Sequence, residues 1–222
     1  MIKLVVLDMA GTTIDEHGDV YRALEGSVTA TGATVKPEDL QTWMGADKTE
    51  AIAALLELGG VTPNPELVAQ QFDLFREILA KSYAQNPPVA LPGVEAALRT
   101  LKSRGIKVGL TTGFSRDVAA PILTSLGWGI GEGELLDAVV TSDEVAAGRP
   151  APYMIHRVME ATGVHDVRAV VAGGDTVVDL LAGHHAGVLP LGVLTGALGR
   201  AELEAHPHQW VLDGVADLPG VI

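Results

Sequence analysis

The sequence predicts a doubly wound α/β fold, in which a parallel sheet lies between layers of helices and an all-helical segment is inserted near the N-terminus. Residues 4–7 form an unbroken apolar run, which is typical of a central parallel strand. From Pro92 onward, helical and strand patterns alternate, as they do in parallel α/β sheets. Between these regions the patterns are helical. We therefore expect a Rossmann-like core of residues 1–14 and 89–222 and a helical cap of residues 15–88.

Three helices are predicted in the inserted segment. The first begins at Pro37, because proline followed by two acidic residues is typical of a first helical turn. The second covers residues 51–58 and ends at a pair of glycines. The third carries an amphipathic stripe of apolar side chains from Val68 to Leu79.

The core segment is expected to contain helices at residues 94–101 and 117–126 and strands at residues 106–110, 138–140, 169–171 and 189–194. Residues 180–199 contain no Asp, Glu, Lys or Arg, which raises the question of a membrane span. Two histidines, a proline and five glycines within this stretch favour a helix end, a turn and a buried strand instead.

Composition limits the classes of partner. The chain of 222 residues has 15 Lys and Arg against 28 Asp and Glu, a net charge of −13, which disfavours nucleic acids and anionic membranes. A small anionic substrate would need a few local cations. The chain has no cysteine, which excludes thiolate catalysis and disulfides, and the short N-terminal apolar run does not resemble a signal peptide. We expect a cytoplasmic protein.

Asp8 is placed for chemistry. It ends the first predicted strand and is followed closely by Gly11, Thr12 and Thr13. Open α/β sheets bind ligands at the carboxyl ends of their strands, so Asp8 is expected in that crevice. We also expect the backbone amides of residues 11–13 to form an anion site beside it. A carboxylate next to an anion site suggests phosphoryl chemistry.

Three further groups follow predicted strands. Thr112 and Gly113 come after the strand at residues 106–110, Arg149 follows the next one, and a glycine pair precedes Asp175, with Asp179 four residues later. Each residue alone has an ordinary structural explanation; an aspartate at a strand end, for example, often caps a helix. Together, the four strand ends carry an acid, a hydroxyl, a cation and a pair of acids. This combination indicates a catalytic site more specifically than any one of these residues does.

These motifs resemble the haloacid dehalogenase superfamily with a helical cap, and residues 8–13 (DMAGTT) resemble the phosphonatase-like (phosphonoacetaldehyde hydrolase-like) hydrolases. The resemblance implies that Asp8 is a nucleophile that accepts the phosphoryl group. It also implies that Mg²⁺ is held by the carboxylates of Asp8 and Asp175 and by the carbonyl of Ala10. The metal would offset the repulsion between nucleophile and substrate.

The resemblance assigns the remaining strand-end residues to the phosphoryl group. Thr112 and the amide of Gly113 would bind a phosphoryl oxygen, and Arg149 would neutralise its charge. Asp179 would orient Arg149 or the waters of the metal. Arg149 takes the place of the lysine that is commoner in the superfamily.

Ala10 is the most informative departure. Superfamily phosphatases carry a second aspartate two residues after the nucleophile, which protonates the leaving alkoxide. Losing that acid costs on the order of 10²–10⁴ in rate. The chain is therefore a weakened phosphatase, or its leaving group is activated in another way.

Phosphonatases activate the leaving group through a lysine imine. Residues 44–48 resemble the phosphonatase cap segment, which puts Lys48 at the imine-forming position. We expect Met44 and Gly45 of this segment, and Phe114 after Thr112, to contact the substrate. Two other interpretations of Lys48 remain: a lysine that only grips the distal group of the substrate, and a solvated lysine at a helix start. Both would leave the chain without an electron sink for P–C cleavage.

Three positions depart from phosphonatases. The histidine expected three residues after the lysine is Ala51, the hinge cysteine is Gly18, and an aromatic hydroxyl is replaced by Phe114. His17 lies near the expected hinge and could serve as a base, although a surface histidine is the simpler interpretation.

The sequence thus favours a Mg²⁺-dependent hydrolase that cleaves the P–C bond of phosphonoacetaldehyde or a close β-carbonyl phosphonate through an aspartyl-phosphate and an imine. The first alternative is a Mg²⁺-dependent phosphatase of small phosphorylated metabolites in which Lys48 only binds substrate. The second is a pseudo-enzyme that has lost its acid. The resemblance also favours a homodimer formed through the cap.

Overall fold

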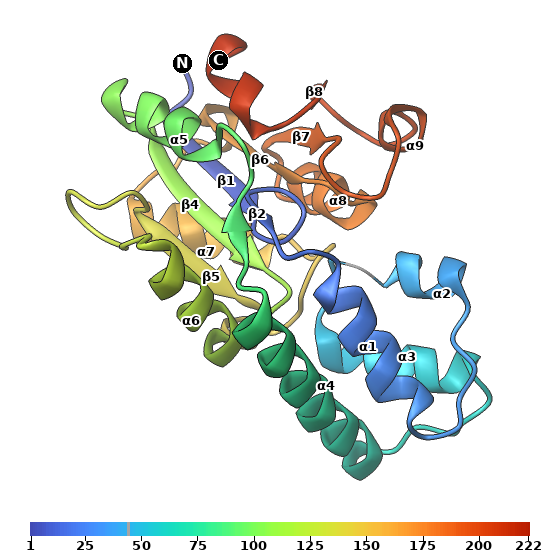
Figure 1. Ribbon diagram of the computed structural model, residues 1–222. Coiled ribbons are helices and arrows are strands. Elements are labelled where there is room, and N and C mark those ends of the chain that lie inside the picture. The colour runs from blue at the N-terminus through green and yellow to red at the C-terminus, as the bar shows by residue number, and fades with distance from the viewer. Residues whose placement is uncertain (44) are drawn as a thin grey trace. The chain divides into compact units, whose positions relative to one another are not determined.

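The computed structural model describes residues 1–43 and 45–222. The chain divides into two compact units (Figure 1): unit 1 contains Met1–Asp15 and Val89–Ile222, and unit 2 contains Glu16–Pro88. Within the described residues no helix is long and apolar enough to cross a membrane. Residues 180–199 instead contain a helix end, a turn and a strand.

Unit 1 is built on a parallel sheet of order β5-β4-β1-β6-β7-β8. Its strands are β1 (Leu4–Asp8), β4 (Lys107–Thr112), β5 (Ala138–Thr141), β6 (Val170–Gly174), β7 (Leu189–Val193) and β8 (Trp210–Leu212). The chain leaves β1 toward β4 and β5 and then returns to β6 on the other side of β1. The sheet order therefore reverses beside β1, and ligands bind at such a switch point in open α/β sheets. This arrangement confirms the predicted doubly wound fold.

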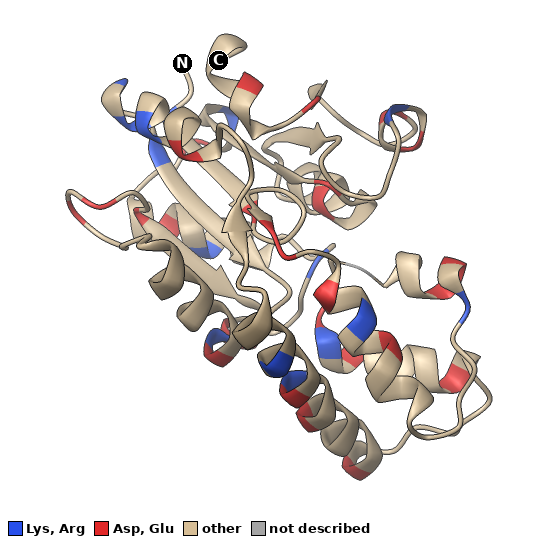
Figure 2. Ribbon diagram, viewed as in Figure 1, with Lys and Arg blue, Asp and Glu red and all other residues tan. Residues whose placement is uncertain are grey.

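Helices cover both faces of the sheet. They are α5 (Val94–Ser103), α6 (Arg116–Leu126), α7 (Tyr153–Thr162), α8 (Val177–His185) and α9 (Arg200–Glu204). Leu4 and Val6 point to the face where α7 and α8 contribute buried apolar side chains such as Val158 and Ala182. Because side chains alternate along a strand, Val5 points to the opposite face. Figure 2 shows that the central strands carry few charged residues, in agreement with a sheet that is buried on both faces.

Unit 2 is all-helical. It contains α1 (Asp19–Thr29), α2 (Pro37–Thr42), α3 (Lys48–Leu58) and α4 (Pro65–Gln85), so the three predicted helices are present and a fourth, α1, precedes them. Figure 1 shows the long helix α4 beside α1. Phe75 and Leu79 on α4 are buried, in accordance with the predicted amphipathic stripe.

A short antiparallel pair lies where the chain passes between the units. Strand β2 (Ile14–Asp15) pairs with β3 (Val89–Ala90). Asp15, which we expected in the inserted segment, therefore belongs to unit 1, because its backbone pairs with Val89. We expected the two hinge strands at residues 15–18 and 87–88, and the paired residues are 14–15 and 89–90 instead. Strands of two residues are too short to give an alternating pattern that would fix their bounds.

Candidate active site

The loop after β1 is a tight turn whose backbone amides donate hydrogen bonds to carbonyls of the same turn. The amides of Thr12, Thr13 and Ile14 all donate to the carbonyl of Met9, at 3.3, 2.9 and 2.9 Å, and the amide of Gly11 donates to the carbonyl of Ile14 at 2.8 Å. The predicted anion site formed by the amides of residues 11–13 is therefore wrong. These amides already have carbonyl partners within the turn, so an anion in this site needs other donors.

The hydroxyl groups of the same loop connect it to the acidic residues. Thr12 Oγ1 donates to Asp175 Oδ1 at 2.7 Å, which joins the loop after β1 to the loop after β6. Thr13 Oγ1 donates to the carbonyl of Asp8 at 2.9 Å. Both threonines are fully buried. The Thr13 hydroxyl holds the backbone at the start of the turn, and the Thr12 hydroxyl orients the carboxylate of Asp175.

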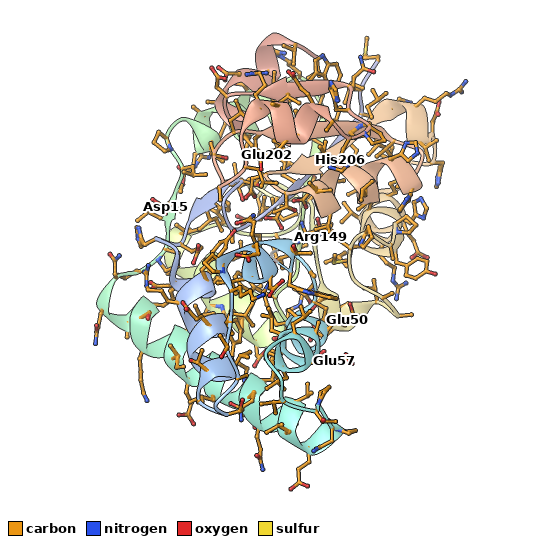
Figure 3. The ribbon with its side chains drawn as sticks, turned by 90° about the vertical axis from the view of Figure 1, so that its right-hand side faces the viewer. Asp15, Glu50, Glu57, Arg149, Glu202 and His206 are labelled. Atoms are coloured by element: carbon orange, nitrogen blue, oxygen red, sulfur yellow. The ribbon has the colours of Figure 1, made fainter. Side chains whose placement is uncertain are left out.

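Arg149 is the centre of a buried ion-pair network. It comes from the loop between β5 and α7 and is labelled in Figure 3. Its Nη2 atom lies 2.7 Å from Asp8 Oδ1, and its Nη1 atom contacts Asp179 Oδ1. The side chains of Arg149 and Asp179 are each 3% exposed and that of Asp8 is 7% exposed. The Nε atom of Arg149 is also buried, and it has no hydrogen-bond partner among the described residues. The network therefore retains one donor for a bound acceptor.

The carboxyl groups of this network crowd one another. Burial raises the pKa of Asp8 to about 6, and the negative charge of Asp179 adds to this rise, while Arg149 opposes it. Burial also raises the pKa of Asp175, followed by repulsion from Asp8 and Asp179. Burial alone would lower the pKa of Arg149, but its attraction to Asp179 and Asp8 raises it instead. Arg149 is thus held in its charged form between two acids.

Asp179 has both a structural and an electrostatic function. Its Oδ2 atom accepts from the amide of Thr176 at 3.1 Å and from the Thr176 hydroxyl at 2.5 Å, while Oδ1 contacts Arg149. Thr176 is the N-cap residue of α8. The helix-capping interpretation of Asp175 is therefore wrong, because the next residue fills that position. Asp175 is free of this structural duty, and its carboxylate is available at the end of β6.

Thr112 ends strand β4 and is buried. Its Oγ1 atom accepts from the amide of Phe114 at 3.1 Å, which occupies a lone pair and leaves the hydroxyl proton available to donate. The hydroxyl of Ser142 lies 3.3 Å from the carbonyls of Gly113 and Phe114 and ties the loops after β4 and β5 together. The ring of Phe114 is buried, so its packing within the fold already explains its apolar character.

The charges and donor atoms fit a hard divalent cation. Asp8, Asp175 and Asp179 are three buried carboxylates, and the guanidinium of Arg149 pairs with Asp8 and Asp179, so full ionisation leaves an excess of negative charge. The pKa values of Asp8 and Asp175 are raised partly because neighbouring carboxylates add negative charge to the site. No group of three or more His, Cys, Asp or Glu residues suited to a metal is present in the described part of the chain. The predicted ligands are two carboxylates and the carbonyl of Ala10, which is not such a group, so this metal site stays a prediction.

Lys48, Gly45 and Met44 belong to unit 2. Lys48 is the first residue of α3, directly after the N-cap Asp47, and its Nζ atom donates to the carbonyl of Ala46 at 3.1 Å. Lys48 is 4% exposed, which argues against a solvated lysine. Gly45 has a φ of 78° and turns the chain before the helix. Met44, which we expected to line the substrate, lies outside the described residues.

His17 is explained by local structure. It has a φ of 61°, and its Nε2 atom lies 3.2 Å from the carbonyl of Pro87, so it links the two ends of unit 2. This contact agrees with the simpler interpretation of His17 as a hinge residue.

The sequence reasoning missed one strand end. Thr195 and Gly196 follow β7, and Thr195 Oγ1 donates to the carbonyl of Gly11 at 2.5 Å. The signal was present in the sequence, because a Thr-Gly pair after a strand is the same pattern that indicated Thr112 and Gly113. The ends of β1, β4, β5, β6 and β7, or the loops that follow them, thus all carry candidate site residues.

Known proteins resemble this chain in sequence and in fold. The family model of haloacid dehalogenase-like hydrolases matches residues 2–187. A phosphonoacetaldehyde hydrolase from Bacillus cereus (strain B4264) is 31% identical over 92% of this chain and 81% of its own length. Among solved structures, a hydrolase from Pseudomonas syringae has a TM-score of 0.88 at 21% identity, covering 99% of this chain and 97% of that chain. A phosphonoacetaldehyde hydrolase-like protein from Oleispira antarctica has a TM-score of 0.82 at 26% identity, covering 99% and 91%.

Proposed function

Because the chain belongs to the haloacid dehalogenase-like hydrolases, we propose that it is a Mg²⁺-dependent phosphonatase-like hydrolase. Its proposed reaction cleaves the P–C bond of phosphonoacetaldehyde or a close β-carbonyl phosphonate. One observation carries the proposal. Asp8 is buried and paired with Arg149, and the residue two positions after Asp8 is Ala10, where a phosphatase needs an acid. The similarity to phosphonoacetaldehyde hydrolases supports the same reaction.

Asp8 is the proposed nucleophile. With a pKa of about 6, its carboxylate is mostly ionised at neutral pH. The 2.7 Å contact with Arg149 fixes one of its oxygens. Attack by the carboxylate on phosphorus would form an aspartyl-phosphate.

Arg149 and Thr112 are the proposed binding groups for the phosphoryl oxygens. The buried Nε of Arg149 supplies a donor without a partner in the described part of the chain, and the hydroxyl of Thr112 supplies a proton. We further propose that the amide of Gly113 contributes. These donors replace the amides of residues 11–13, which are used within their own turn.

The carboxylates of Asp8 and Asp175 and the carbonyl of Ala10 would hold Mg²⁺. When bound, the ion supplies positive charge that offsets the repulsion between the carboxylate nucleophile and an anionic substrate. Asp179 would act through Arg149, whose orientation it fixes. Thr12 holds Asp175 by a hydrogen bond to Oδ1.

Lys48 is the proposed electron sink. Its deprotonated amine would condense with the substrate aldehyde, releasing water and forming an imine. When Asp8 attacks phosphorus, the electron pair of the breaking P–C bond moves into the imine, which is protonated on nitrogen, and gives a neutral enamine. Protonation and hydrolysis of the enamine then release acetaldehyde and restore the amine, while water hydrolyses the aspartyl-phosphate to phosphate. This route needs no carboxylic acid at position 10.

The alternative is a phosphatase in which Lys48 only binds substrate. The hydrogen bond from its Nζ to the carbonyl of Ala46 suits that use, because it positions the amine as a fixed donor. The two functions differ in whether a covalent bond to Lys48 forms during turnover.

Borohydride trapping tests the difference. Phosphonoacetaldehyde and borohydride together should inactivate the enzyme irreversibly and add the reduced substrate fragment to Lys48, as read by peptide mass spectrometry. Lys48→Arg should abolish phosphate release from phosphonoacetaldehyde, whereas Lys81→Arg, at an exposed position on α4, should retain it. Phosphate release by the Lys48→Arg variant at more than a few per cent of the wild-type rate would refute the imine. A panel of phosphate esters with Mg²⁺ identifies the alternative.

A further inference from the structure

We propose that Thr195 and Gly196, in the loop after β7, are positioning residues that hold the Asp175 carboxylate in place for Mg²⁺. This inference rests on the metal site in the proposed function. It adds a fifth loop to the four strand ends from which that site was built. Neither residue carries an ionisable group, so their effect would act through geometry alone.

The hydroxyl of Thr195 joins two loops that the sheet does not join directly. Strand β7 is separated from β1 by β6. Nevertheless Thr195 Oγ1 donates to the carbonyl of Gly11, in the loop after β1, at 2.5 Å. The loop after β6, which carries Asp175, lies between the two loops that this bond connects. The hydrogen bond therefore closes the loops around Asp175.

Two glycine backbones lie against the Asp175 carboxylate. A Cβ atom at Gly11 would lie 2.6 Å from Asp175 Oδ2, and one at Gly196 would overlap the same oxygen. Thr12 donates to the other oxygen, Oδ1, at 2.7 Å. The carboxylate is thus bounded on both oxygens by backbone or by a donor, which restricts its rotation about the Cβ–Cγ bond.

Gly196 is the sharper test of this arrangement. The φ of Gly11 is +82°, so a side chain at Gly11 would also strain the backbone. The φ of Gly196 lies outside the left-handed region, so the backbone itself accepts alanine. The reason for glycine at position 196 is then the space that Asp175 needs. Replacing Gly196 by alanine should therefore displace the Asp175 carboxylate without straining the backbone at position 196.

The expected effect is a loss of metal affinity. Substitutions in the partners that orient metal ligands typically cost about 10–100-fold in metal affinity. We expect Thr195→Val, which keeps the shape and removes the hydroxyl, to raise the Mg²⁺ dissociation constant about 10-fold. Gly196→Ala should raise it by up to about 100-fold. Thr195→Ser keeps the hydroxyl and should bind Mg²⁺ like the wild type.

The experiment is calorimetric titration of each purified full-length variant with Mg²⁺ alone, together with the Mg²⁺-induced rise in the thermal unfolding midpoint. Gly220→Ala is the matched control, because a Cβ there meets no atom within 4 Å. Wild-type affinity in both Thr195→Val and Gly196→Ala would overturn the inference. So would an equal loss in Thr195→Ser and Thr195→Val, since the hydroxyl would then be irrelevant.

Failure of the proposed function is distinguishable. If the wild type binds Mg²⁺ and the two variants lose affinity, the inference stands even if phosphonoacetaldehyde proves not to be hydrolysed. If the wild type does not bind Mg²⁺, both the metal site and this inference are wrong. If all variants hydrolyse phosphonoacetaldehyde with an unchanged dependence on Mg²⁺ concentration, the inference alone is wrong.

Discussion

Replacement of Arg149 by methionine should destabilise the metal-free protein in a pH-dependent manner. The guanidinium contacts Asp8 and Asp179, and all three side chains are almost fully buried. Breaking a buried ion pair by removing one partner costs about 3–5 kcal/mol, because the remaining charges lose their compensation. We therefore expect the free energy of unfolding at pH 7.5 to fall by about 3–5 kcal/mol.

The loss should shrink at low pH. Asp8 has a pKa of about 6 in the folded protein against 3.8 as its ordinary value, and removal of Arg149 takes away the attraction that opposes this rise. At pH 5 the folded variant should hold a proton on Asp8, so one of the two charges that Arg149 compensates is gone there. A neutral buried group without its partner costs about 1–3 kcal/mol, less than an unpaired charge, so the destabilisation should be smaller at pH 5 than at pH 7.5.

Urea denaturation in EDTA at pH 7.5 and pH 5.0 measures both values. Arg157→Met is the control, because Arg157 is 59% exposed and pairs with Glu160 on the same helix. That change should cost less than about 0.5 kcal/mol at either pH. An Arg149→Met loss below about 1 kcal/mol at pH 7.5, or an equal loss at both pH values, would refute the electrostatic reasoning. Activity of Arg149→Met should fall by roughly 10²–10³, as expected for loss of a preorganised donor.

Three further results are expected. Without metal, the wild-type protein should lose on the order of 3 kcal/mol of stability as pH rises from about 4 to 6, because the raised pKa of Asp8 favours the fold only while Asp8 is protonated. Mg²⁺ should restore that stability above pH 6, as read from unfolding midpoints; a flat pH profile would contradict this. Ala10→Asp should raise hydrolysis of phosphate monoesters by on the order of 10² by supplying the missing acid. No gain in steady-state phosphate release would show that another group limits that reaction. Phe75→Ala, at a fully buried position of α4, should lower the unfolding free energy by about 3–5 kcal/mol in denaturation followed by circular dichroism. A loss below 1 kcal/mol would show that unit 2 is loosely packed.

The fold could be predicted from short-range patterns because buried parallel strands are continuous apolar runs. Residues 4–7 show this clearly. The convergence of Asp8 with Arg149 and Asp179 could be predicted for a related reason, since parallel strands end at one edge of the sheet. The chain reaches this site at several separate points: Asp8 ends β1, Arg149 lies in the loop between β5 and α7, and Asp179 lies in the first turn of α8.

The hydrogen-bond partners of the backbone could not be predicted in the same way. The Gly-Thr-Thr sequence correctly indicates a turn after Asp8, but it does not reveal that the amides of residues 11–13 bond within that turn. The carbonyl of Met9 becomes the acceptor for the amides of Thr12 and Thr13, and the carbonyl of Ile14 the acceptor for the amide of Gly11, only when the chain folds back on itself. The Thr-Gly pair after β7 could have indicated Thr195, but it does not reveal the partner, because the carbonyl of Gly11 is 184 residues away. A contact of that kind depends on the order of the strands in the sheet. The sequence indicates the class of fold but not this order.

The placement of Arg149 has a consequence for the order of binding. Its Nη2 and Nη1 atoms are bonded to Asp8 and Asp179, and only Nε lacks a partner in the described residues. Nε cannot neutralise a dianionic phosphonate alone, so the phosphoryl group needs a second cation in the site. The carboxylates that would hold this cation are those whose pKa values are raised by crowding. Metal binding should therefore precede or accompany substrate binding, and in EDTA the protein should show no measurable affinity for inorganic phosphate. Calorimetric titration with phosphate in EDTA and in Mg²⁺ tests this order, and equal phosphate affinity in the two buffers would contradict it.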